Sequence, residues 1–165
     1  MPSSAALNFK RGREREARLD LERFLPYRLS VLSNRVSDAI AREYSDRFGL
    51  SIPEWRIMAV LGGTPSLSAR DVAERTAMDK VQVSRAVECL VRARRVARTA
   101  DAEDGRIQRL ALTAKGRAIY DEVVPLALHL EEVFLSALSA SERAQLDALM
   151  AKLSRQARLL GDGGK

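Results

Sequence analysis

The sequence predicts a mainly α-helical fold that contains one small β-hairpin. Of the 165 residues, 46% are hydrophobic but only 5% are aromatic, so we expect a core of alanine, leucine and valine. Alanine and leucine favour helices. Most apolar residues recur at the three- and four-residue spacing of a helix face, whereas residues 96–112 contain the alternating pattern of two short strands.

The first long helix is expected to begin near Leu25 and to end at Gly49, with residues 1–24 forming a partly disordered arm. Pro26 falls in the first turn, where proline is tolerated, and glycine favours a helix end. The apolar stripe of this helix consists of Leu25, Leu29, Leu32, Val36, Ile40 and Tyr44.

A short second helix is expected after Ser51. Ser51 and Glu54 form a capping box, in which each side chain accepts a hydrogen bond from a free backbone amide of the first turn. The helix ends at Gly62-Gly63, and one side of it is lined by Trp55, Met58 and Leu61.

Residues 68–98 predict two short helices joined by a tight turn. Ser68 with Asp71 gives the first start signal, and Asp79 with Gln82 gives a weaker second one. The second helix has an apolar strip of Val83, Ala86, Val87 and Leu90. A helix that is buried on one side and polar at its N-terminal end suits the major groove of DNA. The pattern therefore predicts a helix-turn-helix.

Residues 96–99 and 107–112 alternate like two strands, and the charged residues between them include Gly105. A hairpin directly after a helix-turn-helix is the wing of a winged helix, and Arg106 near its tip suits a minor groove. The alternative interpretation is an ordinary surface hairpin. The position directly after the helix pair favours the wing.

Two further helices are expected after the hairpin. The first begins after Thr113 and continues to about Leu138, and Pro125 predicts a kink or local break in it. The last begins at Ser139 with Glu142 and continues to about Leu160, before a flexible tail at 161–165. Their stripes contain Ile119, Val123, Leu126, Leu130 and Phe134, and then Leu146, Leu149, Met150 and Leu153.

The striped helices at 25–49 and 114–160 flank a core at 50–113 that is too small to cover them. Large exposed apolar faces normally mark interaction surfaces. We therefore expect a homodimer in which these are dimerisation helices, with two recognition helices about one DNA turn apart.

The net charge of +6 is concentrated in two patches, +3 within residues 10–18 and +4 within residues 80–109. This clustering is typical of proteins that bind a polyanion. One cysteine excludes an intrachain disulfide, and no apolar run reaches the ~20 residues of a membrane span. The sequence also lacks a secretory signal pattern, so we expect a cytoplasmic protein that makes no membrane contact.

Taken in order from Leu25 to Leu153, the sequence resembles the MarR family of bacterial transcriptional regulators. The most specific match is Asp104-Gly105-Arg106 followed by Leu110-Ala111-Leu112-Thr113 and Gly116, which is similar to the family's wing signature. Further matches are Leu50-Ser51, residues 55–61, Leu67-Ser68 with Val72-Ala73, and residues 78–90. Arg94 departs from the pattern, because the family usually has glycine there. Either the helix stops differently, or Arg94 is strained or extended.

The resemblance implies a pseudo-palindromic double-stranded DNA operator. It places Arg106 in the minor groove, makes Asp104 the acid that braces the wing's arginines, and turns Gln82, Ser84 and Arg85 toward the major groove. The full expected DNA-binding set is Ser68, Lys80, Val81, Gln82, Ser84, Arg85, Asp104 and Arg106.

The resemblance also implies a small-molecule effector, commonly an aromatic carboxylate and in a few relatives an aromatic acyl-CoA thioester, that releases the DNA. The candidate ligand-binding residues are Tyr27, Arg28, Leu29, Leu32, Arg35, Trp55, Arg56 and Met58. The simpler interpretation, that Trp55 and Met58 are plain core, is favoured for each individual residue.

Other chemistry has little support. Cys89 lies at the edge of the apolar strip, where an inert cysteine is usual, although a redox-responsive regulator is the alternative. His129 is the only histidine, so no metal site is expected, and no catalytic set or cofactor motif is found. A small-molecule- or protein-binding dimer without DNA binding remains a rival, and the sequence does not separate a repressor from an activator.

Overall fold

The computed structural model describes residues 18–162, and its internal contacts divide the chain into two compact units, residues 1–39 and 40–165. Helix α2 (Leu25–Phe48) crosses the boundary between them and has the bounds expected from its apolar stripe. The basic run at residues 10–18, apart from Arg18, and residues 163–165 of the expected tail lie outside the described residues.

In the described part of the first unit, a turn precedes α2. The Phe24 amide donates to the Leu21 carbonyl oxygen at 3.2 Å, and the helix begins at the next residue. Several large apolar side chains on this half of the helix are exposed, as the dimerisation interpretation expects. They are Leu25, Tyr27, Leu29 and Leu32.

The second unit contains the end of α2 and the short helix α3 (Ile52–Gly62). Gly49 follows α2 with φ of +58°, a conformation that glycine adopts without strain. At the start of α3 the Ser51 hydroxyl accepts from the Glu54 amide at 3.4 Å. The Glu54 carboxylate in turn accepts from the Ser51 amide at 2.9 Å, which confirms the predicted capping box.

The helix-turn-helix is formed by α4 (Ala69–Thr76) and α5 (Lys80–Arg92). The Ser68 hydroxyl accepts from the Asp71 amide at 3.1 Å and caps α4, while the Asp79 carboxylate accepts from the Gln82 amide at 2.8 Å and caps α5. The chain turns between the two helices through Ala77, whose φ is +53°. The predicted pair is therefore confirmed with both of its start signals.

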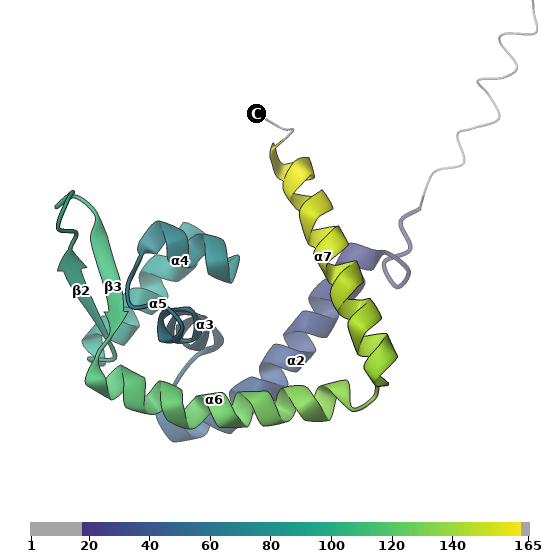
Figure 1. Cartoon of the computed structure of the whole chain (residues 1–165), viewed down its shortest axis with the longest axis horizontal. Coiled ribbons are helices and arrows are strands. Elements are labelled where there is room, and N and C mark those ends of the chain that lie inside the picture. The colour runs from purple at the N-terminus through teal and green to yellow at the C-terminus, as the bar shows by residue number, and fades with distance from the viewer. Residues whose placement is uncertain (1–17, 163–165) are drawn as a thin grey trace, which may run out of the picture. The chain divides into compact units, whose positions relative to one another are not determined.

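The predicted hairpin is formed by β2 (Val96–Ala100) and β3 (Gln108–Leu112), paired antiparallel with Val96 opposite Leu112. A third strand, β1 (Leu67–Ser68), pairs with the other side of β3, so the sheet order is β1-β3-β2. The hairpin stands beside α4 and α5 (Figure 1). The sequence does not predict β1, because two residues after a loop show no periodicity.

One hydrophobic core joins α3, α4, α5, the sheet and the first half of α6 (Ala114–Leu135). Two glycines permit close approaches around it. A Cβ at Gly62 would overlap the Tyr120 ring, and one at Gly116 would overlap the Arg95 carbonyl oxygen. The core's fully buried side chains include Ile57, Met58, Leu61, Val72, Leu90, Leu110 and Val123.

The recognition helix α5 ends at Arg92, and Arg94 adopts the left-handed conformation with φ of +57°. The Arg95 amide then donates to the Leu90 carbonyl oxygen at 2.9 Å and closes the helix end. Of the two alternatives at this position, the strained conformation is the one observed. Arg94 thus has a backbone conformation that a glycine at this position would adopt without strain.

Helices α6 (Ala114–Leu135) and α7 (Ala140–Asp162) follow the sheet. The helix α6 ends before the expected Leu138. Of the kink or local break expected at Pro125, the break is wrong, because the chain stays helical through that residue, and the kink stays a prediction. Ser139 caps α7 through Glu142, as predicted.

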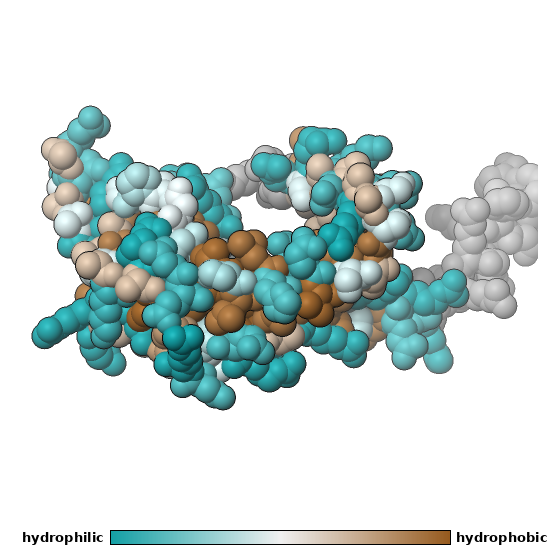
Figure 2. Space-filling view, turned by 60° about the horizontal axis from the view of Figure 1, so that its bottom comes forward, coloured by the Kyte–Doolittle hydropathy of each residue, from teal (hydrophilic) through white to brown (hydrophobic). Residues whose placement is uncertain are grey.

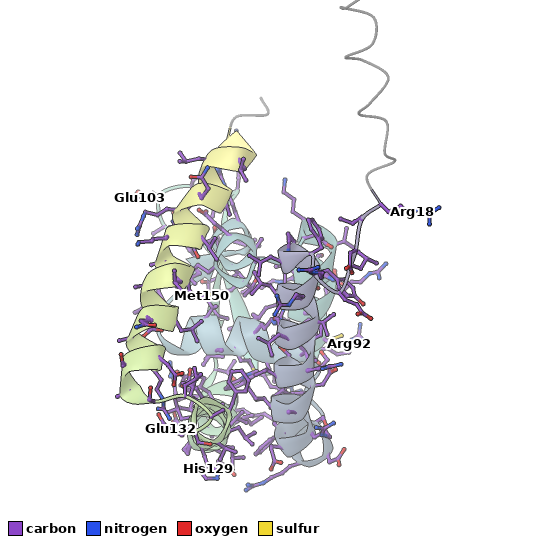
Figure 3. The ribbon with its side chains drawn as sticks, turned by 90° about the vertical axis from the view of Figure 1, so that its right-hand side faces the viewer. Arg18, Arg92, Glu103, His129, Glu132 and Met150 are labelled. Atoms are coloured by element: carbon purple, nitrogen blue, oxygen red, sulfur yellow. The ribbon has the colours of Figure 1, made fainter. Side chains whose placement is uncertain are left out.

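The far part of α6 and all of α7 carry exposed apolar residues. Figure 2 shows a hydrophobic area over α6, and Figure 3 locates His129 and Glu132 on α6 and Met150 on α7. The exposed large hydrophobic side chains here include Leu128, Val133, Phe134, Leu146, Leu149, Met150 and Leu153.

Within residues 18–162, no single helix is long and apolar enough to cross a membrane. Ala114–Leu135 and Ala140–Leu160 meet the length and composition test only when taken together, and they are bent by 107° at their break.

Candidate nucleic-acid interface

The exposed face of α5 displays its polar residues toward its N-terminal end. Val83, Ala86, Val87 and Leu90 are buried, which fixes the rotation of the helix about its axis. No acidic residue lies in the first turn, but the Asp79 carboxylate at the N-cap accepts from the Gln82 amide and offsets the positive end of the helix dipole, so the positive charge at this end comes from the side chains of Lys80 and Arg85. The predicted DNA-binding residues of this helix are all exposed: Lys80, Val81, Gln82, Ser84 and Arg85.

Ser68 lies at the start of α4 and is half-buried. Its hydroxyl accepts from the Asp71 amide at 3.1 Å and donates to the Asp71 carboxylate at 2.7 Å. Hydrogen bonds from the Ser68 side chain, and then from its backbone amide, hold the pKa of Asp71 below its usual value. The predicted DNA-binding role of Ser68 therefore competes with a capping role that already uses its hydroxyl.

Arg106 is exposed in the turn of the hairpin, where the wing interpretation expects it. Asp104 does not brace an arginine side chain. Its carboxylate accepts from the Arg106 backbone amide at 3.0 Å. The carboxylate that pairs with an arginine of the wing belongs to Asp101, which contacts the Arg109 guanidinium. The role that the resemblance gives to Asp104 is therefore wrong in this respect, because the chain path brings Asp101, and not Asp104, to Arg109 at the turn end of the strands.

A groove of about 400 Å³ separates α5 from the hairpin. Its floor is apolar, with Ala73, Val83 and Leu110 among its lining residues, while the cations Arg70, Lys80 and Arg98 also border it. A positively bordered groove between the two elements that the sequence interpretation assigns to DNA binding suits a phosphate backbone. The sequence does not single out Arg70 or Arg98, because nothing local marks a charge as bordering a groove between elements distant in sequence.

The candidate ligand-binding residues fall in both units. In the first unit, a surface hollow of about 490 Å³ is lined by Tyr27, Arg28, Leu32 and Arg35, together with Leu29 and Glu22. In the second unit, Met58 is fully buried and offers no surface to a ligand, as the plain-core interpretation expects.

Trp55 is half-buried in an aromatic cluster of the second unit. Its ring centroid lies 6.0 Å from that of Tyr120 and 5.6 Å from that of Tyr44. Burial raises the pKa of Tyr44 to about 12, against the opposing charge of Arg56. The sequence predicts Tyr44 only as a stripe residue, because its place beside Trp55 depends on how α2 and α3 pack.

The sequence predicts that Cys89 lies at the edge of the buried strip of α5. Its side chain is exposed, so it does not belong to that strip. It borders a hollow of about 210 Å³ that also involves Gln82, Arg85 and Glu54. Among residues 18–162, no group of three or more His, Cys, Asp or Glu side chains is placed to hold a metal ion.

Comparisons with known proteins agree with this geometry. Residues 48–107 match the model of the MarR family. The chain is 28% identical over 131 residues to the HTH-type transcriptional repressor Rv2887 of Mycobacterium tuberculosis, covering 79% of this chain and 91% of the repressor.

Two solved structures are similar over most of their length. A MarR/EmrR family transcriptional regulator from Acinetobacter sp. ADP1 superposes with a TM-score of 0.78 at 26% identity, covering 86% of this chain and 99% of that one. A probable transcriptional regulator from Pseudomonas aeruginosa gives 0.68 at 28% identity, covering 81% and 98%. These relatives are regulators rather than enzymes. The helix-turn-helix, the hairpin of the three-stranded sheet and these similarities together support a winged-helix transcriptional regulator of the MarR family.

Proposed function

We propose that this regulator is a homodimeric repressor that binds a pseudo-palindromic operator and is released from it by a small-molecule effector. The observation that carries the proposal is the pairing of two exposed elements in the second unit. These are the N-terminal face of α5 and the hairpin that presents Arg106, with a positively bordered groove between them. The similarity to Rv2887, which is named a repressor, supports the direction of regulation.

In the proposed complex, α5 enters the major groove and the hairpin enters the adjacent minor groove. Gln82 supplies an amide that suits adenine, and Arg85 a guanidinium that suits guanine. The positively charged side chain of Arg106 is attracted to the negative potential of a narrow minor groove. Cations border the groove between α5 and the hairpin, and they contact the DNA phosphates that lie between the major and minor grooves. These cations, which are Arg70, Lys80 and Arg98, supply affinity without base specificity.

The proposed dimer is supported by apolar surface that the described residues do not cover. On α7, Leu146, Leu149, Met150 and Leu153 follow the helical spacing and are all exposed. The first half of α2 has the same property at Leu25, Leu29 and Leu32. Burying these stripes in a second copy would remove them from water, with a gain of roughly 25 cal/mol for each Å² of apolar surface.

The proposed effector is an aromatic carboxylate or its CoA thioester. The hollow on the first half of α2 supports this class, because Tyr27 and Leu32 offer apolar surface while Arg28 and Arg35 suit an anion. Trp55 and Arg56 of the second unit remain separate candidates for ligand binding. No cofactor and no membrane contact form part of the proposal.

One alternative is supported by a specific observation. The exposed thiol of Cys89 borders the same hollow as Gln82 and Arg85, so its oxidation would place a new polar group beside the proposed base-reading residues. Treatment with peroxide separates the two functions. The wild-type protein and Cys89→Ser would respond alike to peroxide if the regulator senses only a ligand.

The proposal is tested by capturing fragments of its own genome with the purified full chain and footprinting the fragments retained. A footprint with two half-sites about one DNA turn apart is expected. Sedimentation gives the oligomeric state. A thermal-shift screen against aromatic acids and their CoA thioesters, followed by DNA release with each hit, identifies the effector class. Retention of no fragment would favour a dimer that binds only small molecules or proteins.

A further inference from the structure

Asp101 occupies an unusual place in the hairpin. It follows the end of β2 and lies in a segment that is otherwise exposed, yet only 13% of its side chain is accessible. One carboxylate oxygen accepts from the backbone amides of Glu103 at 2.9 Å and Asp104 at 3.1 Å. The other oxygen contacts the Arg109 guanidinium. Both oxygens of this carboxylate are therefore engaged.

The same residue closes the base of the turn through its backbone. The Asp101 amide donates to the Ile107 carbonyl oxygen at 2.8 Å, and the Ile107 amide donates to the Asp104 carbonyl oxygen at 2.9 Å. Side-chain acceptors that bond amides two and three residues ahead hold a turn in one conformation. The residues between the strands are thus tied to Asp101 from both ends of the turn.

Arg106 is connected to this arrangement in two steps. Asp101 fixes the Asp104 backbone amide, and the Asp104 carboxylate in turn accepts from the Arg106 backbone amide at 3.0 Å. The direction in which Arg106 leaves the hairpin therefore depends on a turn that Asp101 holds. Gly105 lies between the two amides, and a Cβ added there would meet nothing within 4 Å, so packing around this residue does not restrain the turn.

Arg109 connects the turn to the helix-turn-helix. It lies opposite Ser68 in the β1–β3 register, and Ser68 caps α4. The hydrogen bond and charge of Asp101, and then the charge of Asp71, raise the pKa of Arg109. Arg109 thus stands between the carboxylate that holds the turn and the carboxylate at the start of α4, so that both carboxylates attract one guanidinium.

We infer that Asp101 is a positioning residue for DNA binding, which holds the hairpin turn in the conformation that directs Arg106 into the minor groove. The inference rests on the proposed function of the wing. It also assigns to Asp101, through the backbone, the bracing that sequence resemblance assigns to Asp104. A merely structural role would change stability but would not act on DNA through Arg106.

The effect of charge on DNA affinity distinguishes a positioning role of Asp101 from a simple electrostatic one. Removing an acidic residue near DNA should strengthen binding, because it reduces repulsion of the phosphates. Glu103 is the matched control, since it is exposed in the same turn and contributes its backbone amide rather than its carboxylate to the Asp101 contacts. We expect Glu103→Gln to bind DNA as tightly as the wild type or slightly more tightly, whereas Asp101→Ala binds more weakly despite the same change of charge.

The experiment is a gel-shift titration of the full-length protein against the tightest fragment captured from its genome, at several salt concentrations. The variants are Asp101→Ala, Arg106→Ala, the double variant and Glu103→Gln. Arg106→Ala is expected to weaken binding about tenfold, a cost within the range of one lost DNA contact. Asp101→Ala should weaken it about fivefold, and the double variant should be no weaker than Arg106→Ala alone.

A separate measurement follows the turn itself. In hydrogen exchange, the amides of Asp104 and Arg106 should lose protection in Asp101→Ala, while amides of α5 keep theirs, which excludes general unfolding. Asp101→Asn should be intermediate, because its amide oxygen still accepts from the two backbone amides but no longer pairs with the charge of Arg109.

The outcomes separate the inference from the function on which it rests. Unchanged DNA binding by Arg106→Ala would refute the proposed role of the wing, and the inference with it. A loss in Arg106→Ala with wild-type binding by Asp101→Ala would refute the inference alone. The inference would also be wrong if Asp101→Ala weakened binding in the Arg106→Ala background as much as it does in the wild type.

Discussion

The guanidinium of Arg95 donates a hydrogen bond to the carbonyl oxygen of Phe48, and so joins the base of the hairpin to the last turn of α2 within the second unit. The backbone carbonyl oxygen of Arg95 accepts from the Thr113 amide at 3.0 Å, so the same residue also holds the start of α6. One half-buried arginine thus connects three elements that are distant in sequence.

Arg95→Ala should lower the free energy of unfolding by about 2 kcal/mol, because a hydrogen bond to a charged group contributes roughly 1.5–3 kcal/mol and the Phe48 carbonyl would lose its partner. Urea denaturation at one fixed protein concentration measures this difference. Arg92→Ala is the matched control on the exposed side of α5 and should change stability by less than about 0.5 kcal/mol. Equal effects of the two variants would show that the Phe48 contact contributes nothing.

Arg94→Gly should stabilise the protein. The left-handed conformation costs a non-glycine residue roughly 1–2 kcal/mol, whereas glycine loses about 0.5–1 kcal/mol more backbone entropy on folding, so a net gain of about 0.5–1 kcal/mol is expected. Glu88→Gly, at an exposed position inside α5, should instead lose about 1 kcal/mol. Thermal unfolding of the two variants compares these opposite signs, and a loss in both would contradict the strain at Arg94.

Features that depend on local sequence are the ones that the sequence predicts. Helix starts depend on local hydrogen bonds, so the caps at Ser51, Ser68 and Asp79 are predictable from spacing alone, and the structure confirms all three. The buried strip of α5 likewise follows from helical periodicity. The expected exposure of apolar residues on α2, α6 and α7 is also observed among the described residues.

Features that depend on contacts between distant segments could not be predicted in the same way. β1 exists only because β3 provides a partner, and its two residues show no pattern of their own. Asp101 and Asp104 are both acids of one turn, and the path of the chain decides which of them reaches Arg109. The groove bordered by Arg70 and Arg98 arises from the packing of α4 against the sheet.

Gly116→Ala should destabilise the protein although alanine favours helices. The new methyl group would overlap the Arg95 carbonyl oxygen, a backbone atom that cannot rotate away, and overpacking of this kind costs typically about 1–3 kcal/mol. Gly63→Ala is the control, because nothing lies within 4 Å of the added carbon. Denaturant unfolding of both variants tests the contact. A stabilised Gly116→Ala would mean that the start of α6 shifts freely.

The stability of the hairpin turn should depend on pH in a range that the pKa of Asp101 sets. The Arg109 guanidinium, and then the backbone amides of Asp104 and Glu103, lower the pKa of Asp101 to about 2. This value is below the ordinary aspartate pKa of about 3.9, so the stabilisation is complete above about pH 4 and is lost as the pH falls through about 2. A carboxyl NMR titration should therefore give a midpoint near the lower value.

The Asp101→Asn variant provides the control for this titration. Its turn amides should lose the transition near pH 2, because the carboxyl group with the lowered pKa has been removed. In the wild type, the Glu103 and Asp104 amide signals should shift together with the Asp101 carboxyl signal. A wild-type midpoint near about 3.9 would contradict the engagement of both carboxylate oxygens.

Arg85→Ala should reduce the discrimination between operator and random DNA. Arg85 is exposed near the N-terminal end of α5, and a bidentate arginine–guanine contact contributes about 1–3 kcal/mol of discrimination. Arg92→Ala removes the same charge from the last turn of the same helix and should change binding to both DNAs by a similar, smaller factor. Competition titrations with operator and random duplexes at one salt concentration measure the ratio. If Arg85→Ala weakens binding to both duplexes equally, Arg85 contacts phosphate rather than a base.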